Sequence, residues 1–331
     1  MKHSVKRSLS ILASFASIAS LAVLCLALPQ TASAEKFSFV ALGDTAYGGK
    51  ADYPAYESLI KKINQTRPAF SIHVGDIWGA GLCNGEHLDE IASLFDQYKN
   101  PLVYTPGDNE WTDCDRRSYG GYAAAERLEN LRNTFFSKPE SLGAKPMAVV
   151  RQSDVSSYTK FRENARWYHK GILFVTLNIS GSSNNFAFDS KEDLNEAFER
   201  NQANIAWLRD SFRIARQEDV AGVVIAFHAE FLMNGELPLD SYNGPNNSVY
   251  GSMVREFRLA GARYGKPVLL IHGDSHEFTV DRPLIESHGE NAPAEYANIT
   301  RLEVFGAPEI KSVKIDVDTK APWVFSFSPL Y

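Results

Sequence analysis

The chain has 331 residues, of which 44% are hydrophobic and 22% charged, and this ordinary globular composition excludes a disordered chain, a collagen or a coiled coil. Its 40 acidic residues outnumber 34 Lys and Arg, which gives a formal net charge of −6. An acidic balance argues against a broad nucleic-acid surface, because binding to a phosphate backbone needs clustered Lys and Arg. It does not exclude a locally positive site created by a bound metal ion.

Residues 1–34 have the pattern of a secretory signal peptide. Three cations precede an apolar run over residues 9–28, and the small residues Ala-Ser-Ala end at residue 34. An uncleaved membrane anchor is the alternative, since the run approaches the ~20 residues that span a bilayer. We expect cleavage after Ala34. This leaves residues 35–331 as one secreted or periplasmic domain without a membrane segment, with 31 cations against 40 anions and a charge of −9.

The first part of the mature chain alternates strand and helix patterns. Apolar, β-branched runs predict strands, and apolar residues at helical spacing predict helices, in the order strand 36–43, helix 53–64, strand 70–75, helix 86–98 and strand 101–106. The connections are short. This order is typical of a parallel sheet with right-handed crossovers.

The second part of the chain continues this alternation and then changes. The same patterns predict, in order, helix 122–136, a strand within 167–178, helix 193–217, strand 222–227, helix 250–264 and strand 267–271. After residue 312 apolar and polar residues alternate, which is typical of half-buried antiparallel strands. Because no internal repeat or linker interrupts residues 36–331, we expect a single domain.

Each of the first three predicted strands ends in a Gly-Asp pair. Asp44, Asp76 and Asp108 are separated by one βαβ unit each, and ligands of open α/β sheets bind at the carboxyl edge where these strands end. One such pair alone is a common turn or helix cap. Three converging carboxylates would repel one another and raise their own pKa values unless a cation were present. The pattern therefore indicates a divalent metal site.

Two later strands end in further residues that bind metals. The strand 222–227 runs into His228, and the strand 267–271 runs into His272, Asp274 and His276. We expect His272 to be structural, with a supporting role behind the ligands as the alternative. Asp and His side chains at several strand ends can form a two-metal site, which suits phosphoryl chemistry.

The order of these motifs resembles that of the calcineurin-like metallophosphoesterases, which include the purple acid phosphatases. That family has Gly-Asp, Gly-Asp, Gly-Asn-His-Asp/Glu, a single His and Gly-His-x-His in this order, and the resemblance covers nearly all of residues 36–331. It implies an α/β fold, namely a four-layer α/β/β/α sandwich of two mixed sheets. It also implies two divalent metal ions at the carboxyl edge of the sheets.

Carried over residue by residue, the resemblance implies six metal ligands: Asp44, Asp76, Asp108, His228, Asp274 and His276. Asp76 would bridge the ions, with Asp44 and His276 on the first and Asp108 and His228 on the second. Asp108 and Asp274 replace a family Asn and a family His. The second site is therefore rich in oxygen, which favours Mn, Mg or Ca, while Fe and Zn remain open as metals.

The first metal site lacks one family ligand. The family's Asp-x-His is Asp44-Thr45-Ala46 here, and Gly79 stands where the purple acid phosphatases have the Tyr of Gly-Asp-x-x-Tyr. Tyr47 is an alternative ligand. We expect the first metal to be held loosely.

The catalytic His of the third family motif is Asn109 in this chain. An amide donates a hydrogen bond but cannot act as a general acid near neutral pH. We therefore expect Asn109 to position the substrate and good leaving groups to be favoured, with His169 and Arg117 as alternative proton donors.

Together these features predict an exported metal-dependent phosphoesterase. It would hydrolyse mono- or diesters of a small phosphorylated substrate through a hydroxide held by two divalent metals. A non-catalytic relative that binds metal or phosphate is the alternative, because Ala46 and Asn109 replace family His residues. A serine esterase is disfavoured, since its Gly-Asp-Ser motif would lie near the N-terminus and not at residues 273–275.

The mature chain keeps two cysteines, Cys83 and Cys114. An even pair in an oxidising compartment favours a disulfide, with two free thiols as the alternative. The cysteines follow the second and third motifs by seven and six residues. A disulfide here would stiffen the rim of the site.

Overall fold

Two β-sheets form the centre of the structure, a computed structural model that describes residues 1, 35–79, 81, 83–186, 190–231, 248–283 and 297–331. The predicted signal segment, residue 1 apart, lies outside these described residues. The first sheet contains, in spatial order, β12 (Phe325–Leu330), β11 (Ser312–Asp318), β1 (Lys36–Leu42), β2 (Ser71–His73) and β3 (Leu102–Tyr104). The second contains β4 (Val150–Arg151), β5 (Ala165–His169), β6 (Ile172–Thr176), β7 (Gly222–Ala226), β8 (Val268–His272), β10 (Ile299–Glu303) and β9 (Thr279–Asp281).

Both sheets are mixed. In the first, β1, β2 and β3 run parallel, while β11 and β12 add antiparallel strands at one side. In the second, β6, β7, β8 and β10 run parallel, while the pairings of β4 with β5, β5 with β6 and β9 with β10 are antiparallel. The parallel strands of each sheet therefore send their carboxyl ends to one edge.

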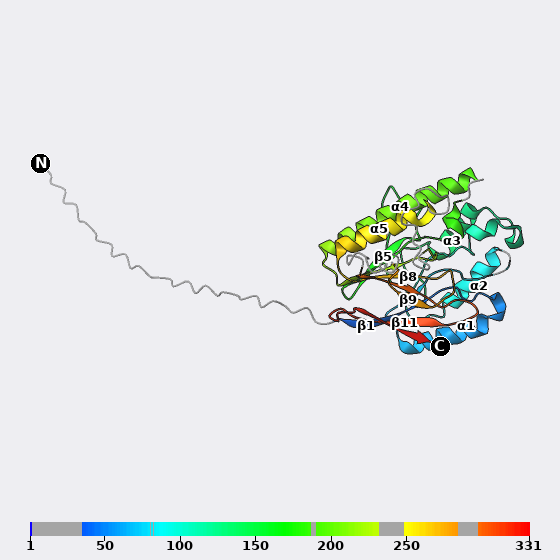
Figure 1. Cartoon of the computed structure of the whole chain (residues 1–331), viewed down its shortest axis with the longest axis horizontal. Coiled ribbons are helices and arrows are strands. Elements are labelled where there is room, and N and C mark those ends of the chain that lie inside the picture. Colours follow the sequence, from blue (N-terminus) through cyan, green and yellow to red (C-terminus); the bar gives the residue numbers. More distant parts are fainter. Residues whose placement is uncertain (2–34, 80, 82, 187–189, 232–247, 284–296) are drawn as a thin grey trace. The chain divides into compact units, whose positions relative to one another are not determined.

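Helices cover the outer face of each sheet, which gives four layers (Figure 1). The helices α1 (Tyr53–Thr66), α2 (Gly85–Phe95) and α3 (Ala124–Phe135) pack on the first sheet through one apolar cluster. The helices α4 (Lys191–Gln217) and α5 (Ser248–Tyr264) pack on the second through another. A third cluster fills the space between the sheets. The predicted α/β/β/α sandwich of two mixed sheets is confirmed.

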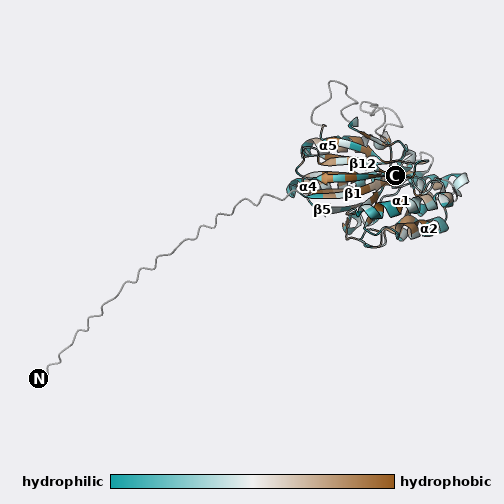
Figure 2. Ribbon diagram, turned by 90° about the horizontal axis from the view of Figure 1, so that it is seen from below, coloured by the Kyte–Doolittle hydropathy of each residue, from teal (hydrophilic) through white to brown (hydrophobic). Residues whose placement is uncertain are grey.

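The helices follow from their sequences. In α1 the buried residues Tyr56, Leu59, Ile60 and Ile63 recur at the spacing of one helical face, and Figure 2 shows apolar and polar segments alternating along this helix. In α4 the Ser190 side chain accepts a hydrogen bond from the Asp193 amide and caps the first turn. No helix in the described ranges is long and apolar enough to cross a membrane.

The sequence prediction of strands was incomplete in the second sheet. The region 167–178 was predicted to contain one strand, but the structure has two antiparallel strands around it, β5 and β6. The strand β10 was not predicted, because its charged residues hide its apolar pattern. Arg301 and Glu303 are nevertheless buried there, where Arg301 pairs with Asp281 of the neighbouring strand.

Candidate metal centre

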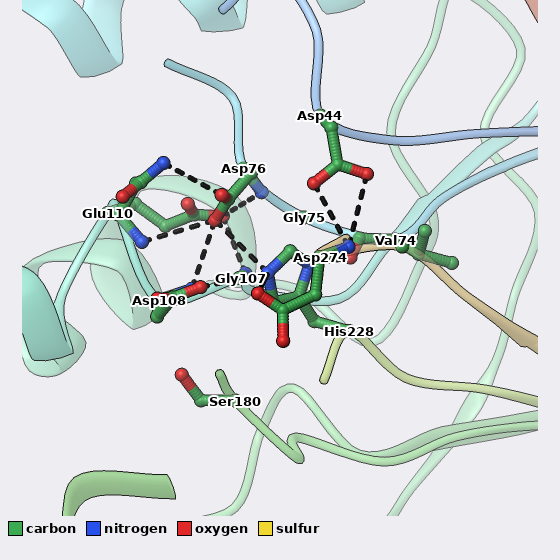
Figure 3. Close-up of polar contacts among 12 residues, drawn as sticks. Asp44, Val74, Gly75, Asp76, Gly107, Asp108, Glu110, Ser180, His228 and Asp274 are labelled. Carbon is green, nitrogen blue, oxygen red and sulfur yellow. Dashed lines mark hydrogen bonds and ion pairs between the residues drawn. The ribbon is translucent and has the colours of Figure 1, made fainter. Parts of the chain in front are cut away.

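All six predicted metal ligands meet at the carboxyl edge of the two sheets. Figure 3 shows five of them, and the sixth, His276, lies 3.6 Å from Oδ1 of Asp44. Each follows a parallel strand: Asp44 follows β1, Asp76 follows β2, Asp108 follows β3, His228 follows β7, and Asp274 and His276 follow β8. Carboxylate oxygens of Asp76, Asp108 and Asp274 lie around Nε2 of His228. The structure thus brings together the residues that the sequence predicted, and their role as metal ligands stays a prediction.

Left-handed backbone turns aim these side chains inward. Asp44, Asp76, Asp274 and His276 have φ values of 50°, 53°, 80° and 68°. Residues other than glycine rarely adopt this conformation, which costs about 1–3 kcal/mol when the surroundings impose it. Strained backbone of this kind concentrates at functional sites.

The glycines of the Gly-Asp motifs leave room for carboxylates of neighbouring motifs. A Cβ atom on Gly107 would lie 2.2 Å from Oδ1 of Asp76, and a Cβ atom on Gly273 would lie 2.2 Å from Oδ2 of Asp44. Any side chain at either position would therefore displace a carboxylate. The glycines let one strand end approach the next closely enough for the carboxylates to converge.

His228 lies among the carboxylates with its ring orientation fixed. Its Nδ1 is 2.8 Å from the Val74 carbonyl oxygen, which can only accept, so Nδ1 carries a proton. Its Nε2 lies 2.9 Å from Oδ1 of Asp108, 3.3 Å from Oδ1 of Asp76 and 3.7 Å from Oδ1 of Asp274. Burial lowers the pKa of His228, but the surrounding carboxylates outweigh burial and raise it well above its ordinary value.

Five of the six predicted ligands, all but Asp274, form two groups that share one residue. Asp44, Asp76 and His276 form the first group, and Asp76, Asp108 and His228 form the second. Within each group the ligand atoms lie within 4.8 Å of one another, which suits ligands around one ion. Asp76 belongs to both groups, so its carboxylate is placed to bridge two ions.

Two of the buried carboxylates, Asp44 and Asp76, have raised pKa values. Burial raises the pKa of Asp44 to about 8 and that of Asp76 well above its ordinary value, with repulsion between neighbouring carboxylates adding to the effect. Asp108 differs, since hydrogen bonds from His228 and Ser182 outweigh burial and lower its pKa to about 2. Divalent cations would supply the missing charge. The carboxylate oxygens suit Mn, Mg or Ca, and the imidazole nitrogens also admit Fe or Zn.

Asn109 and Tyr47 lie beside the shared carboxylate. The Asn109 side-chain amide donates to Oδ2 of Asp76 at 2.7 Å and to the Tyr47 hydroxyl at 3.0 Å. The Tyr47 ring packs edge-on against His276, with ring centroids 4.6 Å apart. Burial and the Asp76 charge raise the pKa of Tyr47 above its ordinary value, so its hydroxyl keeps its proton at neutral pH. The structure therefore places Tyr47 inside the site, in contact with Asn109 and His276.

Sequence reasoning missed two residues that hold the ligands in place. Oε1 of Glu110 accepts hydrogen bonds from the Gly107 amide at 2.7 Å, the Asp76 amide at 3.2 Å and the Tyr104 hydroxyl at 2.6 Å. The Ser182 hydroxyl lies 2.6 Å from Oδ2 of Asp108. Glu110 belongs to a recognised motif and could have been found, whereas no motif surrounds Ser182.

The alternative proton donors lie elsewhere. His169 packs against Phe37 and Phe70 between the sheets, with ring centroids 4.5 and 5.5 Å apart. Arg117 lies in an exposed turn, and no described contact joins it to the site. Its neighbour Arg116 is closer, because a guanidinium nitrogen lies 3.3 Å from the Ser182 hydroxyl.

A disulfide joins Cys83 to Cys114, as the sequence predicted. It links the loops that follow β2 and β3, whose first residues include Asp76 and Asp108. The two sulfur atoms lie 3.5 and 3.6 Å from the Asn109 carbonyl oxygen. The disulfide therefore packs directly beneath the loop that carries Asn109.

Comparisons with known proteins find only distant likeness. No protein-family model and no curated protein sequence matches the chain. Similar solved structures include a dimetal phosphatase from Danio rerio (9% identity, 89% of this chain, 98% of that chain, TM-score 0.49) and the inner membrane complex anchor of Plasmodium (11%, 89%, 88%, 0.46). A 5'-nucleotidase from Candida albicans is also similar, but this chain covers half of its length (12%, 88%, 50%, 0.46).

Proposed function

We propose that this chain is an exported phosphoesterase that hydrolyses phosphate mono- or diesters with the help of two divalent metal ions. One observation carries the proposal: the Asp76 carboxylate is shared by two groups of metal-binding atoms at the carboxyl edge of the sheets. Sites with two ions of this kind favour in-line displacement at phosphorus.

The chain's own residues divide the work of holding the ions. Asp44 and His276 would hold the first, Asp108 and His228 the second, and Asp76 both. Asp274 lies beside His228 and would add an oxygen ligand to the second ion. When bound, the ions would polarise the phosphoryl oxygens and lower the pKa of a water molecule, so that it could attack phosphorus as hydroxide. The Val74 carbonyl and Glu110 keep these ligands in their orientation.

Asn109 and Tyr47 would bind the substrate phosphate. The Asn109 amide and the Tyr47 hydroxyl are neutral hydrogen-bond donors at one side of Asp76, and donors of this kind stabilise charge that develops on phosphoryl oxygens. Neither group is a general acid near neutral pH. The leaving group would therefore take its proton from water or depart as an anion. Substrates whose leaving groups are stable as anions, such as aryl phosphates, should react fastest.

The test is a metal analysis combined with an activity assay. The purified full chain, loaded with Mn²⁺ or Zn²⁺, should turn over an aryl phosphate monoester or diester. A chelator should abolish this turnover, and returning the metal should restore it. Loaded protein that turns over neither ester contradicts the proposal.

A non-catalytic relative that binds metal or phosphate is the second candidate. Asn109 favours it, because the group that would protonate a poor leaving group is missing, and the buried Ala46 offers no ligand to the first metal. This candidate predicts that inorganic phosphate binds to the metal-loaded chain while no ester turns over. The two outcomes separate the candidates.

Export rests on the predicted signal peptide, whose residues beyond the first lie outside the part of the chain that the structure describes. The disulfide between Cys83 and Cys114 supports it independently, because structural disulfides persist in oxidising compartments. We therefore propose a secreted or periplasmic location for the mature chain. Detection of a mature N-terminus at residue 35 in an extracellular or periplasmic fraction would test this.

A further inference from the structure

A third group of metal-binding side chains lies near the proposed two-ion centre and shares no residue with it. Glu230 follows β7, while His272 and Glu303 end β8 and β10, which are the next two strands across the sheet. Their ligand atoms lie within 4.8 Å of one another, like those of the first two groups. All three side chains are almost entirely shielded from solvent.

The buried ring of His272 faces a carboxylate without a hydrogen bond. Its Nδ1 is 2.9 Å from the Gly273 carbonyl oxygen, which can only accept, so Nδ1 carries the proton. Its Nε2 is 3.3 Å from Oε2 of Glu230, and this nitrogen has no hydrogen-bond partner among the described residues. When Nε2 carries no proton, its lone pair points at a carboxylate lone pair. This contact is repulsive unless something positive lies between the two atoms.

The surrounding residues orient Glu303. One of its oxygens, Oε1, accepts hydrogen bonds from the Ser275 hydroxyl and from the Glu277 amide. Side chains that hold a ligand's outer oxygen in this way are the usual support of a metal site. The Ser275 hydroxyl is thereby engaged with a carboxylate and not with an imidazole, which also speaks against a serine nucleophile.

Arg301 is a cation that contacts this group, and its charge is shared. Its guanidinium lies 3.1 Å from Oε2 of Glu230, but it also forms a bidentate ion pair with Asp281. It makes no contact with Glu303 among the described hydrogen bonds and ion pairs. Arg301 therefore shares its charge between Glu230 and Asp281.

We propose that Glu230, His272 and Glu303 bind a third divalent cation that has a structural role. One imidazole nitrogen and two carboxylates suit Zn²⁺, and also Mn²⁺ or Fe²⁺. Such an ion would tie together the ends of β7, β8 and β10. His228 precedes Glu230 by two residues, and Asp274 and His276 follow His272 by two and four. The third ion therefore braces the backbone from which half of the proposed two-ion centre projects.

The test counts zinc ions per chain. The purified full chain is stripped with a chelator, loaded with Zn²⁺ and desalted, and the zinc is measured by elemental analysis. We expect Glu303→Gln and His272→Asn each to lose one equivalent relative to wild type. Glu256→Gln is the matched control, because Glu256 is a nearly buried carboxylate paired with Arg209 in the second helical layer. It should bind as much zinc as wild type.

A third variant separates this proposal from the proposed function. Asp76→Asn should remove zinc from the two-ion centre and keep the equivalent that depends on Glu303. If wild type binds one ion that Glu303→Gln removes and Asp76→Asn does not, the third site stands and the two-ion centre fails. If Glu303→Gln and His272→Asn bind as much zinc as wild type, the third site is overturned.

One measurement does not depend on any variant folding. Anomalous scattering at the zinc edge from crystals of the zinc-loaded wild-type chain should give a peak between Glu230, His272 and Glu303. Absence of that peak, with peaks at the other two groups, overturns the proposal.

Discussion

The Tyr47 ring occupies the space above Gly79, so closely that a Cβ atom on Gly79 would lie 1.9 Å from Cδ1 of the ring. The Gly79 amide also donates to the Tyr47 carbonyl oxygen at 2.8 Å. Gly79 stands where the purple acid phosphatases, which this chain resembles in its motifs, have a Tyr. A tyrosine from a different loop therefore fills this side of the site, and Gly79 is needed to admit it.

We predict that Tyr47→Phe lowers kcat/KM for an aryl phosphate about 10-fold, because it removes one hydrogen bond worth roughly 1–1.5 kcal/mol. The ring packing on Gly79 and His276 would stay, so the metal content should not change. Steady-state kinetics and elemental analysis measure both. Loss of a metal ion from Tyr47→Phe would instead show that the phenol is a ligand.

The sequence predicted the ligands of the two-ion centre because their spacing follows the βαβ repeat. Asp44, Asp76 and Asp108 each end a parallel strand, and parallel strands deliver their ends to one edge whatever the loops do. The contact of Tyr47 with Gly79 depends on how two loops pack, and no spacing rule encodes that. The same holds for Ser182, which reaches Asp108 across 74 residues of sequence.

The third group was missed for a different reason. His272 was interpreted as structural because one buried histidine gives no pattern by itself. Glu303 lies in β10, a strand that was not predicted because its charged residues hide its apolar pattern. Only the side-by-side order of β7, β8 and β10 brings these residues together, and strand order is a property of the whole sheet.

Asp76→Asn should reduce phosphoesterase activity by at least ~100-fold. Mutation of a residue that only supports a metal ligand already reduces activity by about 10–100-fold, and Asp76 would be a ligand of both ions. The Asn side chain has the same size as Asp but lacks the negative charge that both ions need. Activity and metal content should fall together. Asp96→Asn is the control, because Asp96 is an exposed carboxylate at the end of α2 and should leave both unchanged. Full activity in Asp76→Asn would contradict the two-ion proposal.

Asn109→His should widen the range of leaving groups. An imidazole at this position restores a general acid, and general acids contribute about 10²–10⁴-fold where the leaving group needs a proton. We expect the ratio of kcat/KM for an alkyl phosphate to that for an aryl phosphate to rise by about 100-fold or more. Asn109→Ala, which offers no proton, should not raise this ratio. An unchanged ratio in Asn109→His would show that leaving-group protonation does not limit turnover.

The metal-free protein should become less stable as the pH rises. Burial raises the pKa of Asp44 from an ordinary value near 3.8 to about 8, so the folded state holds a proton that the unfolded state has already released. Because the folded state binds more protons between these pH values, the free energy of unfolding falls as pH rises from about 4 to about 8. Thermal unfolding of the chelator-treated chain at several pH values measures this slope. Asp44→Asn should flatten it, and a slope of the opposite sign would contradict the electrostatic picture.

Metal binding should release protons in the same pH range. Below about pH 8 the Asp44 carboxyl is protonated in the metal-free protein and must lose its proton to bind an ion. Affinity should therefore rise with pH up to about 8. Calorimetric titration with Mn²⁺ in buffers of different ionisation enthalpy counts the released protons, and Asp44→Asn should release fewer.

Reduction of the Cys83–Cys114 disulfide should weaken both the fold and the site. The cysteines are 31 residues apart in sequence, and closing a loop of that length stabilises the folded state by about 3–4 kcal/mol in the chain-entropy estimate. The double variant Cys83→Ala/Cys114→Ala should lower the free energy of unfolding by up to that amount, measured by urea unfolding. Because the disulfide lies against the Asn109 carbonyl oxygen, kcat/KM should fall in parallel, with little effect on metal content. A reducing agent should destabilise wild type to the level of the double variant and leave the double variant unchanged. Equal unfolding free energies for oxidised wild type and the double variant would mean that the loops around Asp76 and Asn109 are held by packing alone.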